Sequence, residues 1–237
     1  MDRHPGSQTA REATRHWPWV SGLAAVALAA LLGLLIFARH NGPFLFDEAW
    51  MGVILEHRIG WLEIPALALN FVGGGWFARI LVPVATVGIL LLVRRRCGAL
   101  YYGLAVLLSV IAVQALKAVF DRPRPEEMLV TSDPGSFPSG HVANAATLAV
   151  ALALIFGRVW VWYAGALYTV AMALSRTYLG AHWLSDTVGG ALLGAGIAVI
   201  VWAPLATRLG RERERRTAPG PAGSSTLPPG GAASVEA

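Results

Sequence analysis

Several apolar runs in this chain are long enough to cross a lipid bilayer, and they constrain the fold more than any other feature. The first run covers residues 17–38 and is rich in Ala, Leu and Val. About 20 helical residues, rising roughly 1.5 Å each, span a hydrocarbon core. The runs are continuous rather than alternating with polar residues, which excludes a transmembrane β-barrel. Only 14% of the residues are charged, against about 25% in a soluble domain. We therefore expect an all-α, polytopic membrane protein.

The apolar runs predict six transmembrane helices. Residues 61–93 are too long for one crossing and too short for two, and Gly73-Gly74-Gly75 is the natural break within them. The expected crossings are 17–38, 76–93 (with 66–72 as an interfacial lead-in), 100–120, 141–156, 159–174 and 183–203. Between the first two, residues 39–60 place Trp50, Val53 and Ile54 at helical spacing among acidic residues. This pattern predicts an amphipathic helix on the membrane surface.

Basic residues predict the orientation of the chain and its division into parts. We expect a cytoplasmic segment over 1–16, a six-helix membrane domain over 17–206, and a cytoplasmic tail over 207–237. The tail is basic and then rich in Pro, Gly and Ser, so it is predicted to be disordered. With the N-terminus inside, the cytoplasmic side holds most of the basic residues, as the positive-inside rule requires. These are Arg3, Arg11, Arg15, Arg94, Arg95, Arg96, Arg158, Arg208, Arg211, Arg213, Arg215 and Arg216.

Two other features narrow the class of protein. The chain has a single cysteine, Cys97, so it cannot form an intramolecular disulfide. Its basic residues are not interleaved with stacking aromatics, so nucleic acid is not an expected partner despite the net charge of +5. The expected partners are the bilayer and a lipid substrate, and the oligomeric state stays open.

Three polar clusters stand at the predicted outer ends of the helices. The first holds Lys117 and Arg124, the second is Ser139-Gly140-His141 at the start of a helix, and the third holds Arg176, His182 and Asp186. The third cluster lies two crossings after the second, so all three return to the same face. Ionisable groups at membrane depth are costly and are functional by default.

The first residues of these clusters are suited to binding a phosphate. Arg binds phosphate oxygens in a bidentate manner, and Lys acts as a point charge, so Arg124 and Lys117 are cations for a common anion. Ser139 and Gly140 open a helix whose backbone N–H groups can also bind an anion. Arg176 adds a third cation. Together they would stabilise charge that grows on a tetrahedral oxyanion.

The remaining residues are suited to transferring a phosphoryl group. His182 and Asp186 are four residues apart and therefore share one face of a helix. Asp186 can fix the imidazole tautomer and leave the other nitrogen free as a nucleophile. His141 can protonate the leaving oxygen. These residues form a complete phosphoryl-transfer site without a metal ion or cofactor, so neither is expected.

The spacing of these residues resembles the three motifs of the type-2 phosphatidic acid phosphatase superfamily. The motif residues are Lys117-(six residues)-Arg124-Pro125, Pro138-Ser139-Gly140-His141, and Ser175-Arg176 followed by His182 and Asp186. They span residues 117–186, and the six-helix layout is similar to the membrane-bound branch over about 17–205, which includes bacterial phosphatidylglycerophosphatase B and undecaprenyl-diphosphatases. Asp121 and Arg122 match no motif position and are interpreted as loop contacts.

The resemblance implies a role for each motif residue. His182 would be the nucleophile, acting through a phosphohistidine intermediate, with Asp186 as its partner and His141 as the general acid. The phosphate would be held by Lys117, Arg124, Ser139, Gly140 and Arg176.

The predicted activity is metal-independent hydrolysis of a lipid phosphate at the extracytoplasmic face. Undecaprenyl diphosphate, phosphatidic acid and phosphatidylglycerol phosphate are the leading substrates, and the sequence does not choose between a monoester and a diphosphate. A lipid head-group phosphotransferase using the same histidines is an alternative. A vanadium-haloperoxidase-like oxidation enzyme is disfavoured by the membrane helices. A non-enzymatic lipid transporter would not explain a complete nucleophile–acid set.

Overall fold

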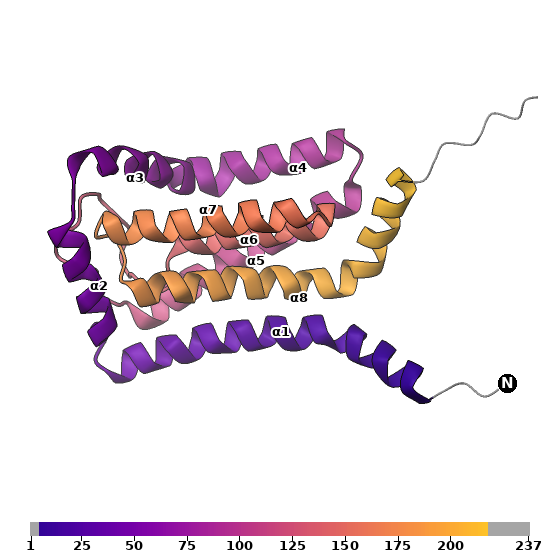
Figure 1. Ribbon diagram of the computed structural model, residues 1–237, viewed down its shortest axis with the longest axis horizontal. Coiled ribbons are helices and arrows are strands. Elements are labelled where there is room, and N and C mark those ends of the chain that lie inside the picture. Colours follow the sequence, from indigo (N-terminus) through magenta and orange to yellow (C-terminus); the bar gives the residue numbers. More distant parts are fainter. Residues whose placement is uncertain (1–4, 218–237) are drawn as a thin grey trace, which may run out of the picture.

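The computed structural model describes residues 5–217, which fold into helices joined by loops and include no strand (Figure 1). The predicted all-α class is therefore confirmed. The helices are α1 (Pro5–Ala38), α2 (Leu45–Glu56), α3 (Gly60–Gly73), the π-helical turn η1 (Phe77–Leu81), α4 (Val82–Leu92), α5 (Arg96–Phe120), α6 (Gly140–Phe156), α7 (Val159–Tyr178) and α8 (Leu184–Thr217).

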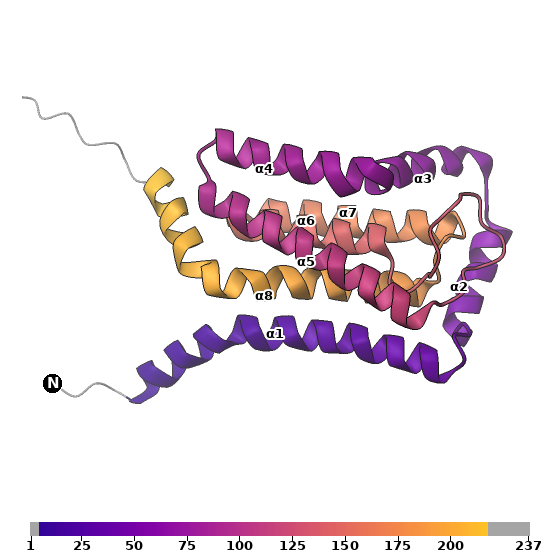
Figure 2. The same cartoon turned by 180° about the vertical axis from the view of Figure 1, so that it is seen from behind.

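Helix α8 lies at the centre of the bundle. It packs against α1 on one side and against α5 and α6 on the other, while α7 packs between α6 and α3 (Figures 1 and 2). Small residues allow these close approaches: a Cβ on Gly22 of α1 would lie 2.8 Å from Ile200 Cγ1 of α8. Close backbone packing of this kind is how helices associate within a bilayer. Large apolar side chains then fill the core between α5, α6 and α8, including Tyr101, Ile155 and Leu193.

The protein is a multi-pass membrane protein, but the structure supports fewer crossings than the sequence predicts. Within residues 5–217, three helices are long and apolar enough to span a bilayer: His16–Ala38 of α1, all of α5, and Leu184–Arg215 of α8. A fourth span is formed if Gly60–Gly73 and Phe77–Leu92, which meet at a bend of 48°, cross together. Helix α6 is apolar but shorter, and α7 is not among the three, so their crossings stay predictions.

The break between α3 and α4 falls where the sequence predicts it. Helix α3 ends at Gly73, and Gly75 has a φ of +57°, in the left-handed region that glycine tolerates best. Residues 66–72 form the second half of α3, and their place at the membrane interface stays a prediction. The predicted amphipathic helix is present as α2, which runs across one end of the bundle in Figure 1. Its place on a membrane surface stays a prediction.

The C-terminal part of α8 differs from the expectation. Residues 207–217, predicted to begin a disordered tail, continue the helix, while residues 218–237 and 1–4 lie outside the described residues. The physical reason is a tertiary contact: Glu212 accepts hydrogen bonds from the backbone N–H groups of Cys97 (3.0 Å) and Gly98 (3.1 Å). A carboxylate at the N-terminus of α5 satisfies unpaired donors there and complements the helix dipole.

Candidate active site

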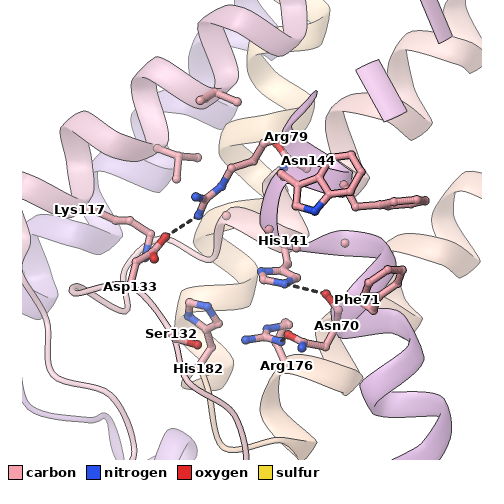
Figure 3. Close-up of a pocket in the computed structure, with 18 of the residues that line it drawn as sticks. Asn70, Phe71, Arg79, Lys117, Ser132, Asp133, His141, Asn144, Arg176 and His182 are labelled. Atoms are coloured by element: carbon pink, nitrogen blue, oxygen red, sulfur yellow. Dashed lines mark hydrogen bonds and ion pairs between the residues drawn. The ribbon is translucent and has the colours of Figure 1, made fainter. Parts of the chain in front are cut away.

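A cavity of about 340 Å³ brings the three predicted clusters together. It lies where the α3–η1 break, the 121–139 loop and the adjoining parts of α5, α6 and α7 meet. The predicted residues that line it are Lys117, Arg124, Gly140, His141, Arg176 and His182. Ser139 and Asp186 are fully buried beside it. All eight residues selected from the sequence thus lie in or directly behind one cavity, part of which is shown in Figure 3.

His182 lies two residues before α8, which begins at Leu184, so it does not share a helix with Asp186 as the spacing predicted. Its two ring nitrogens have different surroundings. Its Nδ1 faces Asp186 Oδ2 at 3.6 Å, which is longer than a hydrogen bond. Its Nε2 lies 3.3 Å from Arg124 Nη1, on the cavity side. The Asp186 carboxylate is itself fixed, because Oδ2 accepts the backbone N–H of Trp183 at 2.9 Å. One ring nitrogen therefore faces a held carboxylate and the other faces the basic part of the cavity.

The surroundings of His182 keep its imidazole neutral. Burial lowers its pKa well below the usual range, and the positive charges of Arg124, Arg176 and Lys117 lower it further. A neutral imidazole has a lone pair available on one nitrogen, which a nucleophile or a base requires.

The three motif cations are held by carbonyl oxygens that leave them facing the cavity. Arg124 donates from Nη2 to the carbonyls of Asp133 (2.7 Å) and Gly135 (3.0 Å). The Lys117 ammonium also donates to the Gly135 carbonyl. Arg176, fully buried in α7, donates to the side-chain oxygen of Asn70 in α3. Side chains fixed in this way need little rearrangement to receive an anion.

The second motif forms the N-terminus of α6. Ser139 is the N-cap residue, and its backbone N–H donates to the Asp186 carbonyl at 3.0 Å, which joins the starts of α6 and α8. A Cβ on Gly140 would meet nothing closer than Val113 Cγ1 at 3.5 Å, an ordinary contact. Protein packing therefore does not require glycine here. Close approach of a ligand to the helix N-terminus would require it.

His141 is positioned by the break between α3 and η1. Its Nε2 lies 3.3 Å from the Asn70 carbonyl oxygen. A Cβ on Gly74 would lie 2.5 Å from the same nitrogen, so the glycine leaves room for the ring. Figure 3 shows His141 and His182 among the residues that line the cavity, with Arg176 drawn below His141 and Asn70 joined to His141 by a dashed line. Asn70 could not be predicted from the sequence, because nothing in the spacing links α3 to the motifs.

Arg122 is not a simple loop contact, and that interpretation was wrong. Its side chain is fully buried and pairs with two fully buried carboxylates, Asp186 at 2.6 Å and Asp47 at 3.0 Å. Asp47, on α2, also accepts hydrogen bonds from the backbone N–H (2.8 Å) and hydroxyl (2.7 Å) of Ser185. The network ties α2 to the start of α8. The sequence does not predict this network, because its members are far apart along the chain. The sequence pattern of α2 predicts only a polar face.

An ion pair that the sequence does not predict also lines the cavity. Arg79 of η1 and Asp133 of the 121–139 loop form an ion pair at 2.5 Å (Figure 3). Both side chains are about half exposed, at 49% and 60%. Neither residue belongs to the three motifs, and their contact joins the predicted second crossing to the 121–139 loop.

Comparisons with known proteins agree with the motifs. A family model of the PAP2 superfamily matches residues 98–209. The chain is 31% identical to the decaprenylphosphoryl-5-phosphoribose phosphatase of Mycobacterium tuberculosis over 151 residues, covering 62% of this chain and 72% of that protein. It is 40% identical to the undecaprenyl-diphosphatase of Sulfolobus acidocaldarius over 65 residues, which is 27% of this chain and only 31% of that protein.

A solved structure has the same fold. The crystal structure of the transmembrane PAP2-type phosphatidylglycerolphosphate phosphatase from Bacillus subtilis superposes with a TM-score of 0.66. The match covers 76% of this chain and 94% of that chain at 23% sequence identity.

Proposed function

Because this chain belongs to the PAP2 superfamily, whose matched relatives are membrane phosphatases acting on lipid phosphates, we propose that it hydrolyses a phosphate monoester or diphosphate of a membrane lipid. Undecaprenyl diphosphate, phosphatidic acid and phosphatidylglycerol phosphate are the proposed substrates. The observation that carries the proposal is one cavity lined by two histidines and three motif cations, His141, His182, Lys117, Arg124 and Arg176.

The proposed first step forms a phosphohistidine. The scissile phosphate binds among Lys117, Arg124, Arg176 and the N-terminus of α6. His182 Nε2 attacks phosphorus, the bond to the leaving oxygen breaks, and His141 gives that oxygen a proton. The negative charge of Asp186 stabilises the ring as it becomes positive, and the cations offset charge on the phosphoryl oxygens.

The proposed second step releases phosphate. His141, now without its proton, accepts one from a water molecule that attacks phosphorus, and the bond to His182 breaks. If an alcohol replaced water at this step, the same residues would carry out the alternative head-group transfer. The three cations supply charge that metal ions supply in other phosphatases, so the reaction is proposed to need no divalent metal.

The apolar wall of the cavity supports a lipid substrate. Phe71, Trp76 and Phe77 line the cavity from the α3–η1 segment. Phe71 and Trp76 remain 65% and 67% exposed, so they present apolar surface on the outside of the bundle next to the phosphate site. An exposed apolar patch of this kind is expected to contact lipid chains. We propose that the alkyl chain of the substrate enters past these aromatic side chains.

The test is phosphate release by purified protein in detergent, with a panel of lipid monophosphates and diphosphates. We expect hydrolysis that excess EDTA leaves intact and that vanadate inhibits, because vanadate mimics the transferring phosphoryl group. His182→Ala is the matched inactive protein. Loss of activity in EDTA with recovery in magnesium would contradict metal independence. Transfer of the phosphate to an added alcohol in preference to water would favour the phosphotransferase.

A further inference from the structure

The cavity carries one more cation than the three motifs supply. Arg79, on the π-helical turn η1, lines the same cavity as Lys117, Arg124 and Arg176. π-Helical turns are rare and occur frequently at functional sites. Figure 3 shows the Arg79 guanidinium reaching toward Asp133 on the side of the cavity where Lys117 lies.

Asp133 places a negative charge beside a site proposed to bind phosphate. Among the described residues that line the cavity it is the one carboxylate. Its hydrogen bond and charge interaction with Arg79 hold the pKa of the Asp133 carboxyl below its usual range, so it is ionised at neutral pH. A fixed carboxylate here would repel an incoming phosphate. This repulsion is avoided if Asp133 pairs with Arg79 only while no substrate is bound.

The geometry allows that exchange. The Asp133 backbone is pinned, because its carbonyl accepts two hydrogen bonds from Arg124, at 2.7 and 3.1 Å. Its side chain is 60% exposed and free to turn into solvent without moving the loop. Half-exposed ion pairs are weak, whereas a phosphate accepts two parallel hydrogen bonds from one guanidinium. A phosphate group can therefore replace the carboxylate at Arg79.

We propose that Arg79 forms a second anion subsite, which binds the phosphate adjacent to the scissile one in a lipid diphosphate, with Asp133 as its displaceable partner. Arg79 is linked through Asp133 to Arg124, which contacts His182 Nε2 at 3.3 Å. Arg79 and His182 line the same cavity, so one molecule carrying two linked phosphates can occupy both positions. The inference rests on the proposed function and extends it: the preferred substrate class is a lipid carrying two adjacent phosphates.

The experiment compares two substrates with the same tail, farnesyl diphosphate and farnesyl monophosphate. Simple loss of Arg79 would leave Asp133 unpaired and repelling both substrates, so Asp133→Asn serves as the background. The measured quantity is kcat/KM for the diphosphate divided by kcat/KM for the monophosphate. We expect this ratio to be about tenfold lower in the double variant Arg79→Gln/Asp133→Asn than in Asp133→Asn, because tenfold corresponds to one charge-assisted hydrogen bond. Arg39→Gln, at a residue that stacks on Phe44 outside the cavity, should leave the ratio unchanged. A change below twofold in the double variant would overturn the proposal.

A binding measurement separates this proposal from the proposed function. Inorganic pyrophosphate and phosphate are titrated by calorimetry into His182→Ala protein, with and without the Arg79→Gln/Asp133→Asn pair. We expect only pyrophosphate to lose about tenfold in affinity, and equal losses would overturn the subsite. If the wild-type protein hydrolyses no lipid of the panel and neither farnesyl substrate, yet pyrophosphate binding depends on Arg79, the proposed function fails and the subsite stands.

A neighbouring anionic lipid is the other source of a second phosphate. The kinetic comparison is therefore made in nonionic detergent alone and again with added phosphatidylglycerol. Dependence on Arg79 without added lipid supports binding of the substrate's own second phosphate. Dependence that appears only with phosphatidylglycerol would overturn that assignment.

Discussion

Three buried charged side chains sit behind the candidate nucleophile. One guanidinium, on Arg122, pairs with the carboxylates of both Asp47 and Asp186, and none of the three side chains is exposed. Removing one member of a buried pair leaves an uncompensated charge, which is far more costly than losing a surface ion pair. Arg122 also holds Asp186 Oδ1 at 2.6 Å while Oδ2 faces His182. The same side chain thus stabilises the fold and sets the angle of the carboxylate.

Replacing Arg122 should therefore affect stability and catalysis together. We expect Arg122→Gln to lower the free energy of unfolding by about 3–5 kcal/mol, because two buried carboxylates lose their shared cation. We also expect the kcat of the folded protein to fall by at least about tenfold, since the Asp186 carboxylate is no longer held. Asp47→Asn is the matched control, because it leaves the Arg122–Asp186 pair in place and should lower Tm with a smaller effect on kcat. Thermal unfolding and active-site-normalised kcat measure the two effects, and a normal kcat in folded Arg122→Gln would show that Arg122 is only structural.

Replacing each of the two histidines should impair a different step of the reaction. His182→Ala removes the nucleophile, so no acid-labile phosphoenzyme should form with any substrate. His141→Ala removes the acid, which is worth about 10²–10⁴ in rate. The loss should be smaller for p-nitrophenyl phosphate than for a lipid phosphate, because p-nitrophenolate leaves without a proton. The measurement is rate against leaving-group acidity together with phosphoenzyme trapping. Phosphoenzyme in His182→Ala but not in His141→Ala would reverse the two roles.

Among the elements, the break between α3 and η1 acts directly on the candidate acid. A methyl group at Gly74 would lie 2.5 Å from His141 Nε2, closer than any normal contact. We expect Gly74→Ala to displace the imidazole and to lower the rate on lipid phosphates more than the rate on p-nitrophenyl phosphate. Gly88→Ala in α4 is the matched control, because a Cβ there meets nothing within 4 Å. Equal rates for the two alanine variants would show that the break does not position His141.

The elements also show what the sequence could predict. The motif residues, such as Arg124, His141 and His182, were placed together because helix periodicity and the alternation of crossings bring the ends of helices to one face. Arg79 and Arg122 were missed, because their partners lie on segments more than fifty residues away and no periodic pattern records such a contact. The end of α8 was misplaced for the same reason.

The basic residues of the chain predict how the protein is oriented in the membrane. We predict that the 121–139 loop faces outward and that both termini are cytoplasmic. In a Cys97→Ser protein, a cysteine at Met128, which is 39% exposed, should react with an impermeant maleimide in intact cells. A cysteine at Val159, which is 69% exposed, should react only after the cells are permeabilised. Labelling in the opposite order would place the cavity on the cytoplasmic side.

The central position of α8 has a consequence for biogenesis. Helix α1 packs mainly against α8, so during synthesis α1 meets its main neighbour only after α2 to α7 have been made. His182 and Asp186 arrive with that same segment. Until then the face of α1 that packs against α8 has no partner. Translation that stopped before His182 would leave a chain without the candidate nucleophile and without the main packing partner of α1.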